Sequence, residues 1–353
     1  RALARRLRTG HAPRVAVKIL LLQLRRIGDL VCTTPAIAAL RAHFPEAHIT
    51  LAVARENEPL LPAIRDIDEF VITRRGLRDL AAWVKLRPGR FDLAIDFTRN
   101  DRSAWLTFLS HAPIRITSIE LPHNFRRHAY TRFAPGSLLD LHTIDFHLAL
   151  LSPIGIVPAS AAPILALPDA ARESASAIIR SKLADQPFAI FHPGAARVER
   201  FWEPARWAEV IEFAARDLGL RPVLTGISSA MEQDHLAAIR SHLRTDVLDL
   251  SGQIDLLTLA ALIERARLLV TLDTGPMHLA TALRTPQVNL FGPGNPLHWR
   301  PRGSPAVILY GENEKPLEEF VPRAPRLPMS LISTRAVIGG MKTLLATPRG
   351  APL

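Results

Sequence analysis

One aspartate stands where a base for proton transfer would be useful. Asp29 lies in the run RRIGDL, residues 25–30, directly after the apolar run 18–24. Ligands of open α/β sheets bind beyond the carboxyl ends of the strands, so a carboxylate here can take a proton from a bound hydroxyl group. The alternative is that Asp29 caps the helix that follows, because aspartate is a favoured N-cap residue. Gly28 is the only glycine of this loop, so the segment lacks the three-glycine dinucleotide fingerprint.

A second group of residues suits a diphosphate. Gly194 follows the apolar run 188–192, and the small residues Ala195 and Ala196 come next. Small residues let backbone N–H groups approach a phosphate, and the dipole of a following helix favours an anion. Arg200 would neutralise the diphosphate, because its planar guanidinium group can bond two phosphate oxygens together. The alternative is an ordinary turn that carries a surface arginine.

The third group is the most specific. Asp273, Thr274, Gly275 and His278 follow the apolar run 268–272. Thr274 and Gly275 would open a helix whose N-terminus attracts an anion. Asp273 or His278 alone suits a structural role, as a cap or as a buried histidine. Together, after a strand and opposite the first two groups, they favour a nucleotide-donor site.

Asp66 and Asp68 match the Asp-x-Asp pattern with which many sugar transferases hold a divalent ion. They precede the expected strand 69–72, so they lie at the entrance of a strand and at the wrong edge of a parallel sheet for ligand binding. We therefore predict no metal site here. The charge of a leaving diphosphate would instead be offset by Arg200 and by backbone dipoles.

Apolar runs alternate with helix-like segments along the chain, which is typical of βα units around parallel sheets. The first series has expected strands at 18–24, 49–53, 69–72 and 91–96 and a helix at 35–44. The second has expected strands at 188–192, 222–225, 268–272 and 287–290 and helices at 204–218, 230–243, 256–265 and 276–283. We therefore expect an α/β protein with two Rossmann-like domains that face each other across a cleft.

The length of 353 residues also favours two domains, because a single core usually stops growing below this size. The stretch between the two series is rich in Ala, Pro and Ser and includes an expected helix at about 170–182. Another helix is expected at 333–345, crossing back to pack on the first domain. The expected divisions are a first domain, a linker region, a second domain and a tail, at residues 1–160, 161–187, 188–325 and 326–353.

The chain is basic, with 44 Lys and Arg against 33 Asp and Glu and a formal net charge of +11. Such a balance favours an anionic partner, and phosphorylated glycolipid or an anionic membrane surface would fit. We find no zinc-ligand spacing and no RNP-like motif, so we do not expect a nucleic-acid partner. A solvated arginine-rich surface without a partner is the alternative.

The cellular location can also be predicted. The apolar runs are far shorter than the roughly 20 residues that a transmembrane helix needs. The basic start of the sequence has no continuous apolar stretch, so it does not look like a secretory signal. The single cysteine, Cys32, fits a reducing compartment. We expect a cytoplasmic protein.

The three groups, in this order, resemble the heptosyltransferases of lipopolysaccharide synthesis, glycosyltransferase family nine. The resemblance runs from Lys18 to about Arg302 and is carried by residues 25–29 with 33–37, 192–202, and 273–278 with 291–293. It implies a GT-B fold and an inverting mechanism without a metal ion or other cofactor. The first domain would bind a lipopolysaccharide acceptor and the second a donor such as ADP-heptose.

The resemblance also implies roles for single residues. Asp29 matches the proposed general base of the family, and Arg25 and Arg26 would contact the anionic glycolipid acceptor. Arg200 stands where members often have lysine. Glu232 would bind the ribose and Ile254 the base of the donor. Ala195 and Ala196 stand where some members have hydroxyl residues.

Other functions stay open at this point. A relative could use another nucleotide sugar or another acceptor of the cell envelope, because one hydroxyl group on a sugar changes few contacts. A non-catalytic nucleotide-sugar-binding protein is possible on the same fold. Asp29, Arg200, Asp273 and His278 argue against such a loss of turnover. The basic composition implies peripheral contact with the inner membrane surface as well.

Overall fold

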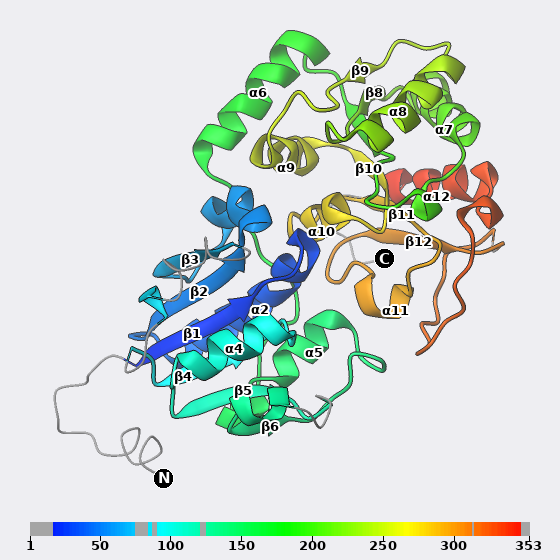
Figure 1. The fold of residues 1–353 in the computed structure, drawn as a ribbon. Coiled ribbons are helices and arrows are strands. Elements are labelled where there is room, and N and C mark those ends of the chain that lie inside the picture. Colours follow the sequence, from blue (N-terminus) through cyan, green and yellow to red (C-terminus); the bar gives the residue numbers. More distant parts are fainter. Residues whose placement is uncertain (1–16, 75–83, 87–89, 121–124, 313, 347–353) are drawn as a thin grey trace.

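The computed structural model describes residues 17–74, 84–86, 90–120, 125–312 and 314–346. Within these residues the strands form two six-stranded sheets, and every paired strand runs parallel to its neighbour (Figure 1). The order is β3-β2-β1-β4-β5-β6 in the first sheet and β12-β11-β10-β7-β8-β9 in the second. The expected α/β class with two Rossmann-like halves is confirmed.

The elements of the first sheet alternate with helices on its faces. Its strands are β1 (Lys18–Gln23), β2 (His48–Ala54), β3 (Glu69–Thr73), β4 (Leu93–Asp96), β5 (Ile114–Ser118) and β6 (Arg132–Ala134). Its helices and helical turns are α2 (Ile27–His43), η1 (Arg55–Ala63), α4 (Asp101–Leu109), η3 (Phe125–Ala129), α5 (Thr143–Ala149) and η4 (Ser152–Ile154). The residues of β1 after Lys18 are buried, as expected for a central parallel strand that is covered on both faces.

The second sheet repeats this plan. Its strands are β7 (Phe188–His192), β8 (Arg221–Leu224), β9 (Leu248–Asp249), β10 (Leu268–Leu272), β11 (Gln287–Phe291) and β12 (Ala306–Tyr310). Its helices and helical turns are α6 (Asp169–Leu183), η5 (Val198–Arg200), α7 (Pro204–Asp217), α8 (Ala230–His242), α9 (Leu256–Arg265), α10 (Gly275–Ala282), α11 (Pro296–Trp299), η6 (Met329–Leu331) and α12 (Thr334–Ala346). Helix α6 lies in the predicted linker region and packs on α9.

The helix expected at 35–44 begins earlier than predicted. Helix α2 starts at Ile27 and has Pro35 in its interior. Proline has no N–H group, so the carbonyl oxygen of Val31 loses its usual helical donor. The Thr34 hydroxyl donates a hydrogen bond of 2.8 Å to this oxygen and replaces the lost donor. The helix therefore continues through the proline.

The last helix packs in a different place from the one expected. Helix α12 lies on α7 and on the strands β10, β11 and β12, so its partner is the second sheet and the expected contact with the first domain is wrong. Its buried side chains Val337, Met341 and Leu344 join the apolar cluster of that sheet. Gly340 allows the close approach, because a Cβ atom there would lie 2.8 Å from Cγ1 of Val307.

No helix among the described residues has both the length and the hydropathy that crossing a membrane requires.

Candidate functional site

The carboxyl edges of the two sheets meet where the first turns of α2 and α10 pack together (Figure 1). The imidazole ring of His278 lies against Gly28, and a Cβ atom on Gly28 would overlap this ring. Nδ1 of His278 is 3.7 Å from Sγ of Cys32 on α2. A Cβ atom on Gly275 would lie 3.9 Å from Cγ2 of Ile27. The fold thus brings the first and third predicted groups together.

Asp29 is the third residue of α2 and is half-buried. Its burial raises the pKa of its carboxyl group to about 6, against opposing effects of the Arg25 charge and of the Arg26 backbone N–H. The N-cap position of the helix belongs to Arg26, so the alternative that Asp29 is the N-cap is wrong. A carboxylate with this pKa is ionised at neutral pH and is more basic than an ordinary aspartate.

An ion pair joins the second group to the third. Nη1 of Arg200 donates to the Asp273 carbonyl oxygen at 2.8 Å and lies 3.1 Å from Oδ2 of the Asp273 carboxylate. Burial raises the pKa of Asp273, and the Arg200 charge opposes this shift. Gly294 packs against the pair, because a Cβ atom there would lie 2.5 Å from Oδ2 of Asp273. The Arg200 side chain keeps 31% of its surface exposed, which leaves part of the guanidinium group accessible.

Glu232 reaches the second group from α8. A Cβ atom on Gly194 would overlap the Glu232 carboxylate, so a larger residue here would require this carboxylate to move. Oε1 of Glu232 accepts a hydrogen bond of 3.1 Å from the backbone N–H of Ile227. Burial raises the pKa of this carboxyl group. Ala195 is buried beside this glycine, whereas Ala196 is exposed.

The remaining predicted donor residues lie at two further places. Thr274 is the N-cap of α10, and its hydroxyl group turns back to the Leu272 carbonyl oxygen at 3.4 Å. Gly275 is the first residue of that helix. Ile254 lies in the turn before α9 and packs half-buried against the apolar core.

The two predicted acceptor residues are exposed at the end of β1. Nε of Arg25 donates to the Thr98 carbonyl oxygen at 3.1 Å. The Arg25 carbonyl oxygen accepts a hydrogen bond of 2.7 Å from the Asn57 side chain. Arg26 is the N-cap residue of α2. The Arg25 side chain thus lies across the end of the neighbouring strand β4.

Asp96 and Arg99 were not predicted as site residues; Asp96 is the last residue of β4, and Arg99 follows this strand at the same edge of the sheet. The buried Asp96 carboxylate accepts hydrogen bonds from the Tyr130 hydroxyl at 2.5 Å and from the Thr98 backbone N–H at 2.8 Å. The signal in the sequence was the polar run TRND at 98–101 directly after an expected strand. The three predicted groups also follow expected strands, so the run 98–101 could have been predicted as a fourth group by the same reasoning.

The first and second halves also meet through polar contacts away from Asp29. Nε2 of His142 lies 2.9 Å from the Arg300 carbonyl oxygen, and Nδ1 of His298 lies 2.9 Å from the Leu141 carbonyl oxygen. Arg302 forms an ion pair of 2.5 Å with Asp145. Burial lowers the pKa of His142 to about 3, so this imidazole is neutral at physiological pH. These contacts hold α5 against the segment that contains α11.

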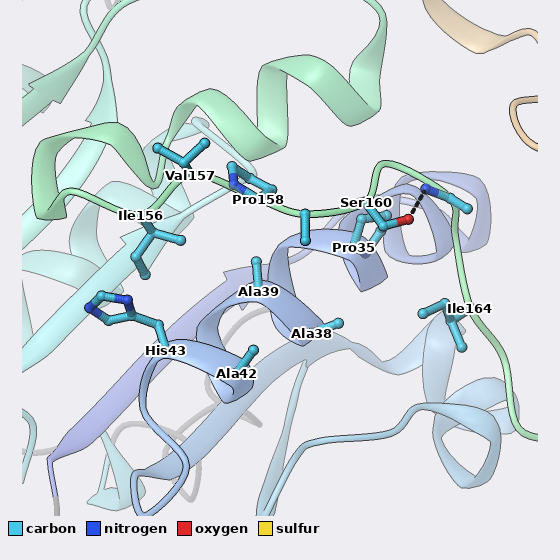
Figure 2. A pocket seen from close by; sticks show the side chains of 12 residues that line it. Pro35, Ala38, Ala39, Ala42, His43, Ile156, Val157, Pro158, Ser160 and Ile164 are labelled. Atoms are coloured by element: carbon cyan, nitrogen blue, oxygen red, sulfur yellow. Dashed lines mark hydrogen bonds between the residues drawn. The ribbon is translucent and has the colours of Figure 1, made fainter.

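A cavity of about 390 Å³ lies elsewhere, between the C-terminal part of α2 and the chain segment 156–164 (Figure 2). It is lined largely by small apolar side chains, among them Pro35, Ala39 and Ala42. None of the predicted site residues lines it. The backbone N–H of Ile164 donates to Oγ1 of Thr34 at 2.9 Å and holds this segment against the helix.

The Asp-x-Asp pattern has a structural role. Oδ2 of Asp68 accepts hydrogen bonds from Nη2 of Arg41 at 2.6 Å and from the Ile49 backbone N–H at 2.7 Å. The pair of aspartates lies at the amino end of β3, as predicted. Among the residues with described positions, no group of three or more His, Cys, Asp or Glu side chains could hold a metal ion.

Comparison with known proteins identifies the family. Residues 80–326 match the family model of glycosyltransferase family 9 (heptosyltransferase). Lipopolysaccharide heptosyltransferase 3 of Escherichia coli (strain K12) is 25% identical over 345 residues, which cover 93% of this chain and 98% of that protein.

Two solved structures share the fold over most of the chain. The glycosyl transferase family 9 protein from Veillonella parvula DSM 2008 has a TM-score of 0.81 and 25% identity, and the alignment covers 94% of this chain and 97% of that one. The E. coli ADP-heptose lps heptosyltransferase II has a TM-score of 0.77 and 23% identity, with 94% and 99% covered. These neighbours confirm the GT-B fold. The chain belongs to glycosyltransferase family 9, the heptosyltransferases.

Proposed function

We propose that the chain, which is a glycosyltransferase by its family, transfers heptose from ADP-heptose to a sugar of the lipopolysaccharide core, with inversion and without a metal ion. The observation that carries the proposal is the contact of Gly28 with His278. This contact sets α2, which carries Asp29, against α10, which opens the third group of residues.

The proposed donor site belongs to the second half of the chain, with 188–325 as its proposed limits and 1–160 as those of the acceptor domain. Its proposed residues are Gly194, Ala195, Ala196, Arg200, Glu232, Ile254, Asp273, Thr274, Gly275 and His278. The contacts of Glu232 with Gly194 and of Arg200 with Asp273 support a single site for most of them. The name of the E. coli heptosyltransferase II, a structural neighbour, supports ADP-heptose as the donor.

In the proposed mechanism an acceptor hydroxyl oxygen attacks the anomeric carbon of the donor. A new glycosidic bond forms as the bond from that carbon to the diphosphate breaks on the opposite face, and the configuration inverts. Asp29 accepts the hydroxyl proton, which contributes on the order of 10²–10⁴ in rate. The Arg200 guanidinium group offsets the charge that develops on the leaving diphosphate.

The proposed acceptor is an anionic glycolipid that Arg25 and Arg26 contact, at the cytoplasmic face of the inner membrane. Peripheral membrane contact is supported by the net charge of +11 and by the surface of α4. On this helix Trp105 is 53% exposed and Phe108 is 41% exposed. Arg126 and His128 line the same pocket as these two rings. Aromatic rings with basic neighbours are typical of surfaces that lie on an anionic bilayer.

Transfer by the purified protein tests the proposal directly. The protein would be mixed with ADP-heptose and with lipopolysaccharide core lacking the terminal heptoses, and the product would be measured by mass spectrometry. We expect one added heptose, unchanged yield in a chelator, and an inverted anomeric centre. A nucleotide panel in a thermal-shift assay tests the donor separately, because a ligand stabilises the state that binds it. Equal shifts for ADP, UDP and GDP species would contradict the ADP-heptose donor.

Two alternatives give different results in the same assays. A relative that uses another nucleotide sugar or another envelope acceptor would transfer sugar only when those compounds are supplied. A non-catalytic nucleotide-sugar-binding protein would show a thermal shift and no transfer with any acceptor.

A further inference from the structure

Two arginine side chains converge at the carboxyl ends of neighbouring strands in the first sheet. Arg25 follows β1, and Arg99 follows β4, which pairs with β1 in parallel. Nε of Arg25 donates to the carbonyl oxygen of Thr98 at 3.1 Å. The Thr98 hydroxyl oxygen accepts a hydrogen bond of 2.7 Å from the Leu24 backbone N–H. The two strand ends are thus tied together, and both guanidinium groups are held near this point.

The backbone at Arg99 is built to hold its side chain in place. Oδ1 of the buried Asp96 accepts hydrogen bonds from the Thr98 N–H at 2.8 Å and from the Arg99 N–H at 3.1 Å. Arg99 has φ of 59°, in the left-handed region that residues other than glycine rarely adopt. Strained backbone of this kind is common at functional sites. The guanidinium carbon of Arg99 lies 4.5 Å from the centre of the Phe146 ring, which orients the group further.

The electrostatics of this pair favour a bound anion. The Arg99 side chain is 14% exposed, and its Nη1 lies 4.0 Å from Oε2 of Glu120. Nε of Arg99 is buried and has no hydrogen-bond partner among the described residues. Burial and the neighbouring Arg25 charge both lower the pKa of Arg99, and the charges of Glu120 and Asp96 oppose this shift. Burial, with smaller contributions from the Arg25 and Arg99 charges, lowers the pKa of His147 to about 3, so this imidazole adds no charge at neutral pH.

We propose that Arg25 and Arg99 form an oxyanion subsite that binds a phosphate or carboxylate group of the acceptor sugar and so selects which hydroxyl group reaches Asp29. The inference rests on the proposed function and adds Arg99 to the acceptor side of the site. Guanidinium groups bind such oxyanions with two parallel hydrogen bonds, which fixes orientation as well as position.

The subsite is close enough to Asp29 to affect its chemistry. Arg25 precedes Asp29 by four residues, and its charge lowers the pKa of the Asp29 carboxyl group. An anion bound to Arg25 offsets this charge, so the pKa of Asp29 rises when a charged acceptor binds. The anionic group of the acceptor therefore has two effects: it orients the acceptor through Arg25 and Arg99, and it makes Asp29 a stronger base.

The test compares two acceptors that differ only in the anionic group, made by enzymatic removal of phosphate or by reduction of the carboxylate. For Arg99→Ala we expect KM for the charged acceptor to rise about tenfold or more, with donor affinity unchanged. With the neutral acceptor the variant and the wild type should have the same KM. Arg99→Lys should recover part of the loss, because a lysine keeps the charge but not the planar fork. Arg65→Ala is the control, since Arg65 is exposed before β3 at the opposite edge of the sheet.

A binding measurement separates this inference from the proposed function. Titration of a sugar phosphate and a sugar carboxylate into the protein by NMR needs no transfer. We expect binding of one of them to the wild type and its loss in Arg99→Ala, with unchanged melting temperature. No binding to the wild type, or an equal KM increase for charged and neutral acceptors, would overturn the subsite even if heptose transfer is confirmed. Binding without any transfer would support the subsite and contradict the proposed function.

Discussion

The imidazole ring of His278 lies directly on the backbone of Gly28, and the contact joins the two halves of the protein at their carboxyl edges. Gly28 is the second residue of α2, where an alanine would favour the helix by about 1 kcal/mol on local grounds. Gly28 is therefore explained by its contact with His278, because α2 alone would be more stable with an alanine at this position. Close approach of the two halves is the physical reason for this glycine.

This relationship predicts the effect of Gly28→Ala. The added methyl group overlaps the His278 ring, so either this ring or the helices α2 and α10 must shift, and both changes alter the position of Asp29 relative to the donor residues. We expect transfer to fall about tenfold or more, because a misplacement of 1 Å can cost about 100-fold in rate. The measurement is kcat and KM for both substrates, beside the melting temperature.

A matched glycine gives the control. Gly339 is in α12, and a Cβ atom there would meet nothing within 4 Å. Gly339→Ala should stabilise the protein by about 0.5–1 kcal/mol and leave transfer unchanged. The double variant Gly28→Ala/His278→Ala lacks the imidazole ring, so the packing of α2 against α10 should be restored. A Gly28→Ala enzyme with full activity would show that this contact does not set the geometry of the site.

Asp29→Asn separates catalysis from a structural role. The change removes the proton acceptor and keeps the size of the side chain, so we expect turnover to fall by at least ~100-fold while donor affinity stays within about twofold. In the wild type, kcat/KM should fall about tenfold per pH unit below about pH 6, where the carboxyl group with a pKa of about 6 becomes protonated. An active Asp29→Asn enzyme would end the assignment of Asp29 as the base.

The same pKa predicts a stability effect with a defined sign. The folded protein holds the Asp29 proton more tightly than the unfolded chain, since burial raises the pKa from 3.8 to about 6. Ionisation therefore lowers the stability as the pH rises from about 4 to 6, and the loss is complete above that range. Asp29→Asn should unfold with a free energy higher by about 1–3 kcal/mol at pH 7, and this gain should vanish at pH 4. Urea titrations at both pH values measure it.

The strands show how much of the fold could be predicted. The strands β7 and β10 were predicted, because Phe188–His192 and Leu268–Leu272 are continuous buried runs. The strand β9 was not predicted, because Leu248–Asp249 is too short to give a pattern. The strand β12, Ala306–Tyr310, was missed although it is apolar, because the segments around it gave no helix to complete a βα unit. Long buried runs specify their own structure, and short edge elements depend on their neighbours.

The three groups of site residues could be predicted from the sequence, but the contacts between residues of different groups could not. Each group follows a strand, so topology alone brought Asp29, Gly194 and Asp273 to carboxyl edges. The pairing of Arg200 with Asp273 joins residues 73 positions apart, and no spacing in the sequence encodes it. Arg99 was missed for the same reason, since its role depends on a backbone conformation that only the folded Asp96 loop imposes.

Arg200→Ala tests the donor side. The loss of a charged hydrogen bond to the diphosphate should weaken donor binding by about 1.5–3 kcal/mol, and Arg200→Lys should recover part of it. The exposed neighbour Arg197, which pairs with Glu199 at 3.4 Å, gives the control Arg197→Ala with unchanged donor affinity. Calorimetry with ADP measures both variants. Unchanged affinity in Arg200→Ala would limit this residue to holding the buried Asp273.

The surface of α4 predicts how the protein reaches its acceptor. Trp105 and Phe108 are exposed on α4, which begins at Asp101, two residues after Arg99. At 1.5 Å per residue, Phe108 lies roughly 10 Å along the helix from its first residue, so a bilayer on this face would lie close to the proposed acceptor subsite. We expect the double variant Trp105→Ala/Phe108→Ala to bind anionic vesicles at least about fivefold more weakly, because buried apolar area contributes to interfacial binding.

The vesicle experiment needs a control for apolar exposure in general. Leu139 is 54% exposed in the same half of the chain and is not part of the α4 surface, so Leu139→Ala should bind vesicles as the wild type does. Binding should weaken as salt is added, since a chain with a net charge of +11 attracts anionic headgroups through screened electrostatics. Transfer to an acceptor dissolved in detergent should be unchanged in the double variant, and transfer to the same acceptor in vesicles should fall. Equal vesicle binding by the wild type and the double variant would move the membrane contact to another face.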